Sequence, residues 1–466
     1  MCNSLPYAVS IFTSTTLNKS KLTLKHHIRE TAVLSLPLVI SQIGHIITGM
    51  VDNIFLGRIG KTEQAAGILA NNLFILLLVF SIGMSYSLTP LVSQAHAKNN
   101  NQEKAFLLKN GLYLNFGVSI LLSLILYFAS PLLHFAQQPK DVVDLSLPFF
   151  HIITISIIPC SLFFAGKQYT EGLNNTVIAM VVSVVGNLLN ILLNYLLING
   201  KWGLPEMGYM GSCWATFIAR CFMGGFFVVL LFYSKPFKSF RPFLKKAAFS
   251  IQHCWQLFKL GIGFAMQFTF EVTAFALSGL MTGWYGKEQI DAHGIALSIA
   301  AFTYMFSSGI SGAATIRVGN FKGQNDYMNV NKASNASMIS VLVVMGFFAV
   351  IFFSLHSYLP QAFSTDQEVI GLASKLLIIA GFFQLFDGMQ VTILGILRGL
   401  GDVRVPTIIT LIGYWIICLP LSYFFGKILG YTAQGIWSAL LCGLSFVAVS
   451  LYIRFRVLMK RKLLQL

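Results

Sequence analysis

Apolar stretches long enough to cross a lipid bilayer recur along almost the whole chain from Thr31 onward. Hydrophobic residues make up 56% of the 466 residues and charged residues only 10%, whereas soluble domains average about 25% charged residues. A helix needs about 20 apolar residues to span a bilayer. The sequence therefore predicts an all-α polytopic membrane protein with twelve transmembrane helices. The expected spans are 31–57, 66–94, 109–134, 147–169, 176–198, 209–233, 256–284, 290–316, 335–356, 368–397, 404–426 and 432–455.

The basic residues are distributed unevenly over the predicted loops. If both termini lie on one side, that side carries 24 of the 32 Lys and Arg residues, among them Lys167, Arg317 and Arg398. An excess of Lys and Arg marks the cytoplasmic side of a membrane protein, so both termini are expected in the cytoplasm. The net charge of +16 then reflects membrane topology, and we expect no nucleic-acid partner. Arg220 and Lys375 fall within predicted spans, and Arg220 could pair with an acid or lie near the membrane edge.

The two halves of the chain resemble each other. At an offset of 226 residues, segment 83–100 aligns with segment 309–326. The matching pairs include Gly83 and Gly309, Gly57 and Gly283, and, at an offset of 227, Gly172 and Gly399. Six spans per half is an even number, so the halves form a parallel repeat with a pseudo-two-fold axis along the membrane normal. Transporters built this way bind substrate between the halves.

The repeat divides the chain into two lobes of six helices each. The expected parts are a cytoplasmic N-terminal tail at 1–30, an N-lobe at 31–234, a basic cytoplasmic linker at 235–255, and a C-lobe at 256–466 with a short basic tail.

Three carboxylates lie inside otherwise apolar spans: Asp52, Glu271 and Asp387. An ionised carboxylate in hydrocarbon is costly, so such residues face a polar cavity, pair with a partner, or bind a cation or proton. The pattern indicates ion-coupled transport, and we expect the three side chains to share one vestibule.

Asp52 has polar neighbours on its helix. His45 and Gly49 share its face at helical spacing, and Asn53 follows it directly. These residues predict a protonatable or cation-binding site in the N-lobe. Alternatively, Asp52 lies late enough in its span to be wetted by solvent.

The C-lobe acids lie in two different spans. Gln267 precedes Glu271 by one turn among several Phe residues, and phenyl rings penalise the charged form of a carboxyl group. Gln384 and Gln390 flank Asp387, and amide and carboxylate oxygens suit a hard cation such as Na⁺. The alternatives are a neutral buried acid at Glu271 and a helix–helix contact at Asp387.

Other features narrow the function class. Pro37 lies four turns before Asp52 and acts either as a hinge or as a static kink. No Walker A, HExxH, GxSxG or Cys-His arrangement is present. The seven Cys residues form no CxxC pair. We therefore expect neither an enzyme nor a cofactor.

The motifs "MVDNIFLGRIG", "FTFEVTAF", "DAHGIALSI", "IRVGNFKGQND", "FDGMQVTILGILRGLGD" and "YWIICLPLSYFFG" occur in this order along the chain. Over nearly its whole length the chain resembles multidrug and toxic compound extrusion (MATE) transporters of the bacterial NorM-like branch. The resemblance implies a monomer in the bacterial cytoplasmic (inner) membrane. It also implies that small-molecule organic cations leave the cell against inward flow of Na⁺ or H⁺, the coupling ion.

The resemblance also assigns roles to residues. Asp52, Glu271 and Asp387 match the family's acids on spans one, seven and ten, and the C-lobe pair is implied to bind the coupling ion. Asn187, Asn190 and Asn194 resemble polar positions on span five.

Three positions depart from the family pattern. Phe383 stands where some members carry Tyr, which removes an oxygen ligand for Na⁺. Gly263 replaces a frequent Pro, and Gly294 replaces a frequent Gln.

Two other functions are compatible with the predicted fold. A lipid-linked oligosaccharide flippase of the same superfamily would be expected to carry basic residues in its cavity, whereas here we expect acids. In a non-transporting intramembrane protein, the internal repeat would be incidental to the function. Na⁺ and H⁺ both remain open as the coupling ion.

Overall fold

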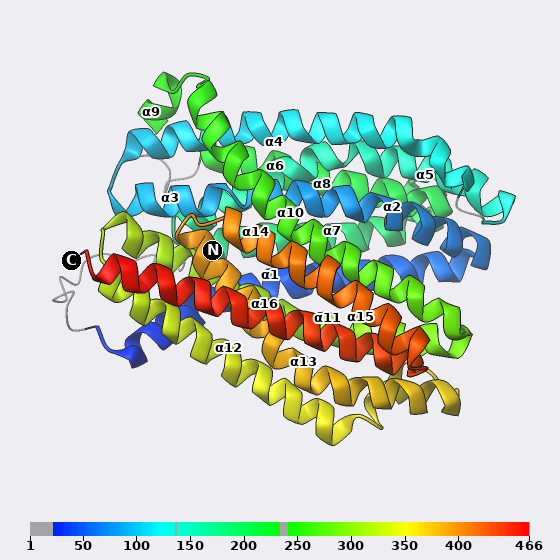
Figure 1. Ribbon diagram of the computed structural model, residues 1–466. Coiled ribbons are helices and arrows are strands. Elements are labelled where there is room, and N and C mark those ends of the chain that lie inside the picture. Colours follow the sequence, from blue (N-terminus) through cyan, green and yellow to red (C-terminus); the bar gives the residue numbers. More distant parts are fainter. Residues whose placement is uncertain (1–21, 136–137, 234–240, 466) are drawn as a thin grey trace.

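The computed structural model describes residues 22–135, 138–233 and 241–465 (Figure 1). All regular secondary structure in these residues is helical, so the predicted all-α class is confirmed. Twelve helices or helix pairs in them are long and apolar enough to cross a membrane. The chain is a multi-pass membrane protein.

The N-lobe and C-lobe each contain six of these spans. The N-lobe consists of α1 (Leu24–Ile59), α2 (Lys61–Ser85), α3 (Leu88–Ala97), α4 (Asn101–Ala129), η3 (Ser130–Phe135), α5 (Lys140–Ile155), α6 (Ile157–Gly172), α7 (Thr176–Asn199), η4 (Lys201–Gly203) and α8 (Tyr209–Tyr233). The C-lobe consists of α10 (Ile251–Thr282), η6 (Gly283–Tyr285), α11 (Lys287–Gly323), α12 (Tyr327–Leu355), η7 (Leu359–Ala362), α13 (Gln367–Gly399), α14 (Arg404–Leu411), η8 (Ile412–Cys418), α15 (Leu419–Tyr423), η9 (Phe424–Ile428) and α16 (Thr432–Leu463).

The predicted tail and linker differ from the structure at their edges. Residues 1–21 of the tail, residue 234 at the end of the predicted N-lobe and residues 235–240 of the linker lie outside the described residues. Helix α1 begins at Leu24, inside the predicted tail. The short helix α9 (Arg241–Lys246) and the start of α10 at Ile251 fall inside the predicted linker 235–255.

Three spans are irregular where the sequence predicted continuous helices. The second span breaks between α2 and α3, where the Ser87 hydroxyl donates to the Met84 carbonyl at 2.9 Å. The fourth breaks at Ser156, close before Pro159, which has no N–H to continue the helix. The π-helical segment η8 precedes Pro420 in the eleventh span. By contrast, α1 continues through Pro37 without interruption.

The lobes meet through contacts that follow the internal repeat. Helix α1 packs on α11, and α10 packs on α2 in the equivalent way. Gly309 lies against Val39, and Gly83 lies so close to Ala265 that a Cβ atom would meet its backbone. Both contacts have the offset of 226 found in the sequence, because Val39 and Ala265 are also 226 residues apart. The repeat is therefore visible in the packing as well as in the sequence.

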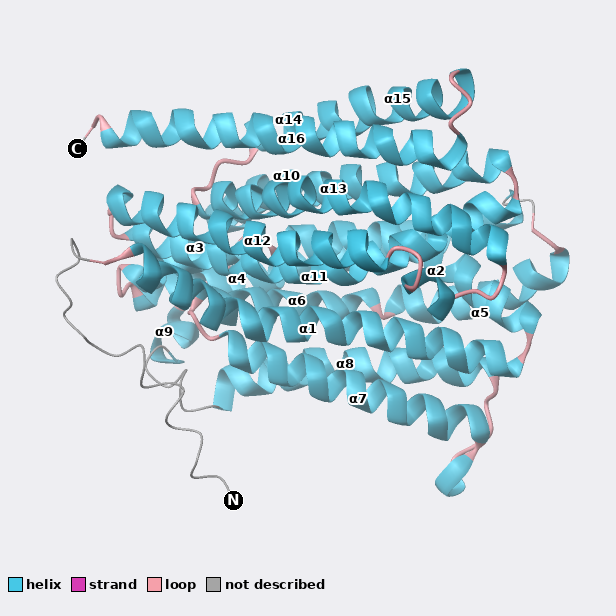
Figure 2. Ribbon diagram, turned by 90° about the horizontal axis from the view of Figure 1, so that it is seen from below, coloured by secondary structure: helices cyan, strands magenta, loops and turns pink. Residues whose placement is uncertain are grey.

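The two ends of the bundle are joined differently. We call the end that holds the start of α1, the helix α9 and the end of α16 the basic end (Figures 1 and 2). There the Arg317 guanidinium of α11 donates to the His27 carbonyl and the Thr31 hydroxyl of α1, both at 2.6 Å. Gln42 and Ser308, midway along their helices, form a further bond between the lobes at 3.2 Å. Within the described residues, the side-chain hydrogen bonds between the lobes lie between the basic end and the middle of the bundle.

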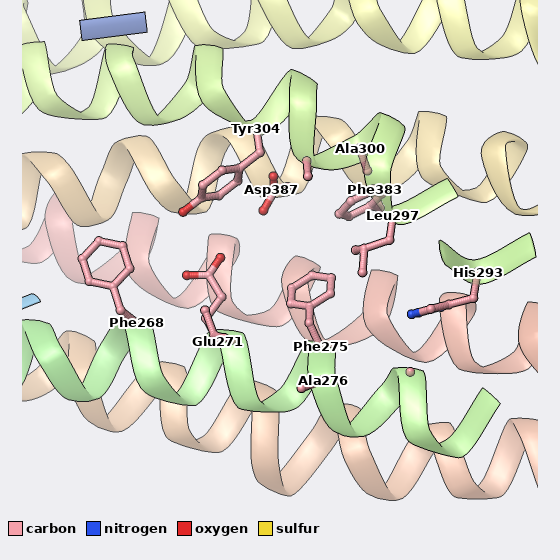
Figure 3. Close-up of a pocket in the computed structure, with 13 residues that line it drawn as sticks. Phe268, Glu271, Phe275, Ala276, His293, Leu297, Ala300, Tyr304, Phe383 and Asp387 are labelled. Carbon is pink, nitrogen blue, oxygen red and sulfur yellow. The ribbon is translucent and has the colours of Figure 1, made fainter. Parts of the chain in front are cut away.

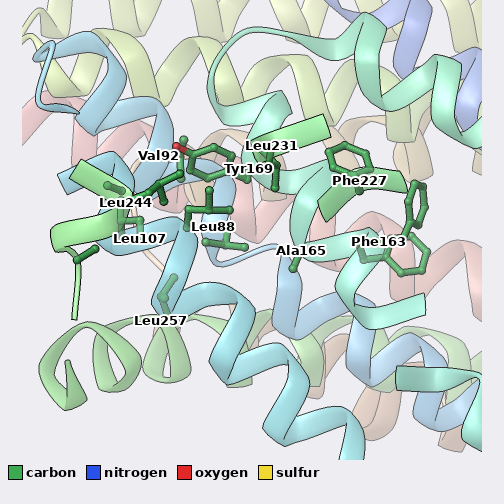
Figure 4. Packing of buried hydrophobic residues seen from close by; sticks show 14 of the residues in the cluster. Leu88, Val92, Leu107, Phe163, Ala165, Tyr169, Phe227, Leu231, Leu244 and Leu257 are labelled. Atoms are coloured by element: carbon green, nitrogen blue, oxygen red, sulfur yellow. The ribbon is translucent and has the colours of Figure 1, made fainter. Parts of the chain in front are cut away.

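Apolar side chains fill the lobes and also cover their outer surface. One buried cluster of the N-lobe joins α3, α4 and α6 around Leu88, Phe163 and Tyr169 (Figure 4). Many large apolar side chains are exposed, among them Phe128 and Phe347 at 76% and 63%. Exposure of this kind fits a surface that faces lipid rather than water.

Candidate transport site

Glu271 of α10 and Asp387 of α13 line one cavity of about 420 Å³ in the C-lobe. Figure 3 shows their carboxylates turned toward the same space, with Tyr304 of α11 beside them. Both acids are nearly inaccessible, at 8% and 3% exposed. The remaining wall is mostly apolar and includes Phe383, which the sequence also proposed as a cavity residue. We call this space the C-lobe cavity.

Gln390 holds the Glu271 carboxylate in place. Its amide nitrogen donates to Glu271 Oε1 at 3.3 Å and to the Tyr414 hydroxyl at 2.6 Å. Its own carbonyl oxygen is buried without a hydrogen-bond partner among the described residues. This leaves an acceptor oxygen beside two carboxylates.

The other two predicted glutamines do not line the C-lobe cavity. Gln267 donates to Thr407 at 3.0 Å and accepts from Arg398 at 3.4 Å. Gln384 is fully buried and donates to Thr303 of α11 at 2.6 Å. Both side chains therefore tie helices together instead of facing the cavity.

Arg398 lies inside the C-lobe, although the sequence analysis assigned it to a cytoplasmic loop. It lies in the last turn of α13 and is 6% exposed, and its guanidinium carbon lies 4.6 Å from the centre of the Phe268 ring. The rings of Tyr86 and Phe264 also flank it, and aromatic faces attract a cation. With Glu271, Arg398 lines a small compartment next to the C-lobe cavity.

Asp52 lines a different cavity, of about 640 Å³, in the N-lobe. Asn194 donates to its carboxylate at 2.7 Å and to Asn190 at 3.1 Å, and Asn190 donates to Thr216 at 3.1 Å. The predicted residues His45, Asn53, Asn187 and Asn190 all line this space. We call it the N-lobe cavity.

Two basic side chains also line the N-lobe cavity. Lys167, expected in a cytoplasmic loop, is 4% exposed inside α6. Arg220 of α8 donates to Ser156 at 2.6 Å and covers the Phe74 ring at 4.8 Å. The N-lobe cavity therefore holds two basic residues beside the expected acid Asp52.

The expectation of one shared vestibule is wrong. The small compartment shares Glu271 and Tyr304 with the C-lobe cavity, and it shares only Tyr86 with the N-lobe cavity. Tyr86 lies at the break between α2 and α3, so this break supplies a residue that lines both the small compartment and the N-lobe cavity.

Comparisons with known proteins identify the family. The sequence model described as MatE matches residues 37–196 and 264–424, one segment in each lobe. The chain belongs to the MatE family. It is 31% identical to a probable multidrug resistance protein NorM of Agrobacterium fabrum over 442 residues, covering 94% of this chain and 95% of the relative. It is 30% identical to the multidrug resistance protein MdtK of Yersinia pseudotuberculosis, covering 93% and 96%.

Solved structures agree with this fold. The crystal structure of the eukaryotic MATE transporter AtDTX14 matches with a TM-score of 0.85 at 17% identity, covering 94% of this chain and 98% of that one. The resemblance to the MATE family is thus confirmed.

Sequence reasoning missed several residues of this MATE site. Tyr304, Tyr414 and Tyr86 gave no signal because a tyrosine in an apolar span is common. Lys167 and Glu171 did offer a signal: opposite charges at i and i+4 on one helix face suggest a shared environment. Glu171 is 4% exposed, and one of its oxygens lacks a partner among the described residues.

The site offers few ligands for a tightly held metal. In the part of the chain that the structure describes, no group of three or more His, Cys, Asp or Glu side chains comes together. Glu271 and Asp387 are a pair of carboxylates supplemented by neutral oxygens.

Proposed function

We propose that this chain exports amphiphilic organic cations, including drugs, in exchange for inward movement of H⁺ or Na⁺. The observation that carries the proposal is the burial of Glu271 and Asp387 against one C-lobe cavity. Two ionised carboxylates in so apolar a space are costly. A bound proton or Na⁺ removes part of that cost. The names of the relatives, which are multidrug resistance proteins, support drugs as the cargo.

Gln390 supports either coupling ion. Its amide steadies the Glu271 carboxylate, and its free carbonyl oxygen can join the two acids in binding Na⁺, which prefers oxygen ligands. A proton needs only one of the acids. In both cases the ion lowers the negative charge that a cationic substrate senses, so the two bind in a mutually unfavourable way.

Alternating access requires the lobes to rock against each other. The hydrogen bonds of Arg317 with His27 and Thr31 join the lobes at the basic end. We propose that both termini lie in the cytoplasm, since Lys and Arg gather at this end. The present arrangement is then outward-facing, and opening inward breaks the Arg317 bonds. The chain would act as a monomer in the bacterial cytoplasmic membrane.

Dye export by the purified chain in proteoliposomes tests the proposal. Ethidium movement is followed under an imposed pH gradient and then under an imposed Na⁺ gradient. Wild type should respond to one of them, and Glu271→Gln should reduce the response roughly 5- to 150-fold, the range of typical coupling energies. Glu368→Gln is the matched control, because this exposed acid lies on α13 outside the cavity. A wild type that moves no dye under either gradient would contradict export.

A second function is favoured by one observation. Lys167 and Arg220 in the N-lobe cavity are the residues expected of a flippase for anionic lipid carriers. Reconstitution with a fluorescent lipid diphosphate would test it, because flipping exposes the label to an external quencher. No change in quenching on addition of the protein would rule this function out.

A further inference from the structure

Helices α12 and α16 enclose a groove at the basic end, apart from the two cavities described above. Its volume is about 470 Å³, which lies in the usual range for a small-molecule site, roughly 300–1,000 Å³. Helix α12 contributes Asn331 to the lining, and the end of α16 contributes Arg456, Lys460 and several apolar residues. We call this space the α12–α16 groove.

Apolar packing holds the two helices together beneath the groove. Met459 lines the groove, is 3% exposed, and belongs to the same buried cluster as Val330 of α12 and Phe455 of α16. Two other lining residues, Val457 and Leu464, are 40% and 77% exposed. The groove therefore has a packed floor, and its open side offers apolar side chains to a ligand.

The two cations of the groove have no acid close by. None of its described lining residues is acidic, and neither Arg456 nor Lys460 forms an ion pair shorter than 4.0 Å within the described residues. The nearby Arg454 differs, because its guanidinium pairs with Asp402 at 2.7 Å. Residues four apart lie on one face of a helix, so Arg456 and Lys460 present two positive charges to the same anion.

The groove lies at the depth where lipid headgroups begin. Helix α16 has 32 residues, whereas about 20 apolar residues cross the hydrocarbon core. The expected span ends at residue 455, so Arg456 directly follows it. Toward the membrane, the same face carries Tyr452, whose ring centre is 6.0 Å from the Arg456 guanidinium carbon, and Val449, which is 52% exposed. A ligand here meets positive charge at one end and apolar surface at the other.

Asn331 offers the ligand a further polar contact. Its Oδ1 atom is buried and has no hydrogen-bond partner within the described residues. An unsatisfied buried acceptor is costly, and a donor on a ligand would remove that cost. The terminal torsion of an asparagine side chain has a broad range, so a rotation can turn this oxygen into the groove. A hydroxyl group is a donor of the required kind.

We propose that the α12–α16 groove binds an anionic phospholipid, phosphatidylglycerol, with its phosphate between Arg456 and Lys460 and a headgroup hydroxyl donating to Asn331. Basic pockets between membrane helices bind anionic headgroups, and two unpaired cations favour this lipid over a zwitterionic one. The inference goes beyond the export function, because it concerns the lipid that joins α12 to α16. It holds whatever cargo the chain carries.

Native mass spectrometry of the purified full chain tests the site by counting bound lipids. The chain in a neutral detergent is titrated with dioleoyl phosphatidylglycerol or with dioleoyl phosphatidylcholine, which has the same acyl chains and no net charge. Wild type should bind the first phosphatidylglycerol more tightly than phosphatidylcholine. The double variant Arg456→Gln/Lys460→Gln should weaken that binding roughly 25-fold, about fivefold for each basic residue lost. Equal binding of the two lipids by wild type would overturn the site.

Two further double variants separate a specific site from general charge and from misfolding. Lys245→Gln/Lys246→Gln removes the same charge from exposed lysines of α9, also at the basic end, and should bind as wild type does. Arg456→Lys/Lys460→Arg keeps the charge and should keep most of the affinity. If both glutamine double variants weaken binding equally, the attraction is spread over the basic end and the proposed site is wrong.

Phosphatidylmethanol isolates the contribution of Asn331, because it carries the same phosphate charge on a headgroup without a hydroxyl. Wild type should prefer phosphatidylglycerol roughly fivefold, the worth of one hydrogen bond, and Asn331→Leu should bind both lipids alike. A preference that Asn331→Leu retains would overturn the proposed headgroup contact. Displacement of phosphatidylglycerol by an equal concentration of inorganic phosphate would show that the groove binds free phosphate, and the lipid assignment would be wrong.

Discussion

Glu271 in the C-lobe and His45 in the N-lobe occupy equivalent positions of the repeat, since the offset of 226 that relates α10 to α1 superposes them. The same offset places Asp52 opposite Ser278, a buried serine of α10. An acid in the N-lobe is thus equivalent in the repeat to a neutral residue in the C-lobe. The two cavities have the same origin in the fold and different chemistry.

The second pair of helices shows the same divergence. At the offset of 227 that relates α13 to α6, Asp387 falls on Cys160 and Arg398 falls on Glu171. A carboxylate is matched by a thiol, and a guanidinium by a carboxylate. The charges of the C-lobe are therefore not a copy of those in the N-lobe.

The scaffold has diverged much less. Gly83 against Ala265 and Gly309 against Val39 preserve one close contact in both halves. The close contacts between the lobes are thus the same in both halves, whereas the charges that line the two cavities differ.

The largest effect is expected when the charge of a cavity acid is removed. Asp387→Asn should reduce the response of transport to an ion gradient roughly 5- to 150-fold, because the C-lobe pair loses one of its two charges. Asp52→Asn should keep the gradient response and change mainly the concentration of dye that half-saturates transport. Initial rates in proteoliposomes, with and without the gradient, measure both quantities.

A control variant and a contradicting outcome complete this test. Glu63→Gln removes an acid of α2 that lines neither cavity and should behave as wild type. If Asp52→Asn abolishes the gradient response while Asp387→Asn retains it, the assignment of coupling to the C-lobe is wrong.

A smaller effect is expected where the halves are alike. Gly83→Val and Gly309→Val should each destabilise the joined lobes by about 1–3 kcal/mol, the usual cost of overpacking. Gly83 should be the more sensitive, since a new Cβ atom meets backbone atoms of Ala265, whereas at Gly309 it first meets a methyl group of Val39. Thermal unfolding of the purified variants measures the difference.

Gly117 provides the control for the glycine test. It lies on α4 with open space around a new Cβ atom, so Gly117→Val should change stability little. Equal and small losses at all three positions would show that the symmetric contact does not limit packing.

The architecture was accessible from sequence because its signals are local. Apolar length gives each span, and one register of glycines gives the repeat. The breaks at Tyr86 and Ser156 were not accessible, since a turn inside an apolar run leaves the hydropathy unchanged. These breaks bear on the cavities, because Tyr86 lines both the small compartment and the N-lobe cavity, and the Ser156 hydroxyl accepts a hydrogen bond from Arg220.

The direction of side chains was predicted less well than their identity. Glu271, Asp387 and Asp52 all line cavities, but Gln267 and Gln384 face neighbouring helices. The rotation of a membrane helix is set by packing against its neighbours, and spacing along one helix does not contain that information. Arg317, Lys167 and Arg398 were assigned to loops for a similar reason: each lies near enough to a helix end for the sequence to favour the membrane surface.

The smallest effect is expected from a substitution that tests whether Na⁺ is the coupling ion. Phe383 lines the C-lobe cavity one turn before Asp387, and its ring is nearly perpendicular to that of Trp437, with 5.8 Å between the ring centres. Phe383→Tyr adds an oxygen beside the acids and should lower the Na⁺ concentration that half-saturates transport by up to about tenfold, the worth of one hydrogen-bonding group. Phe382→Tyr is the control, because the Phe382 ring is 55% exposed and does not line the cavity. If the transport rate does not depend on Na⁺ concentration in wild type or in either variant, Na⁺ is excluded as the coupling ion. The proton is then the ion that Glu271 and Asp387 bind and release.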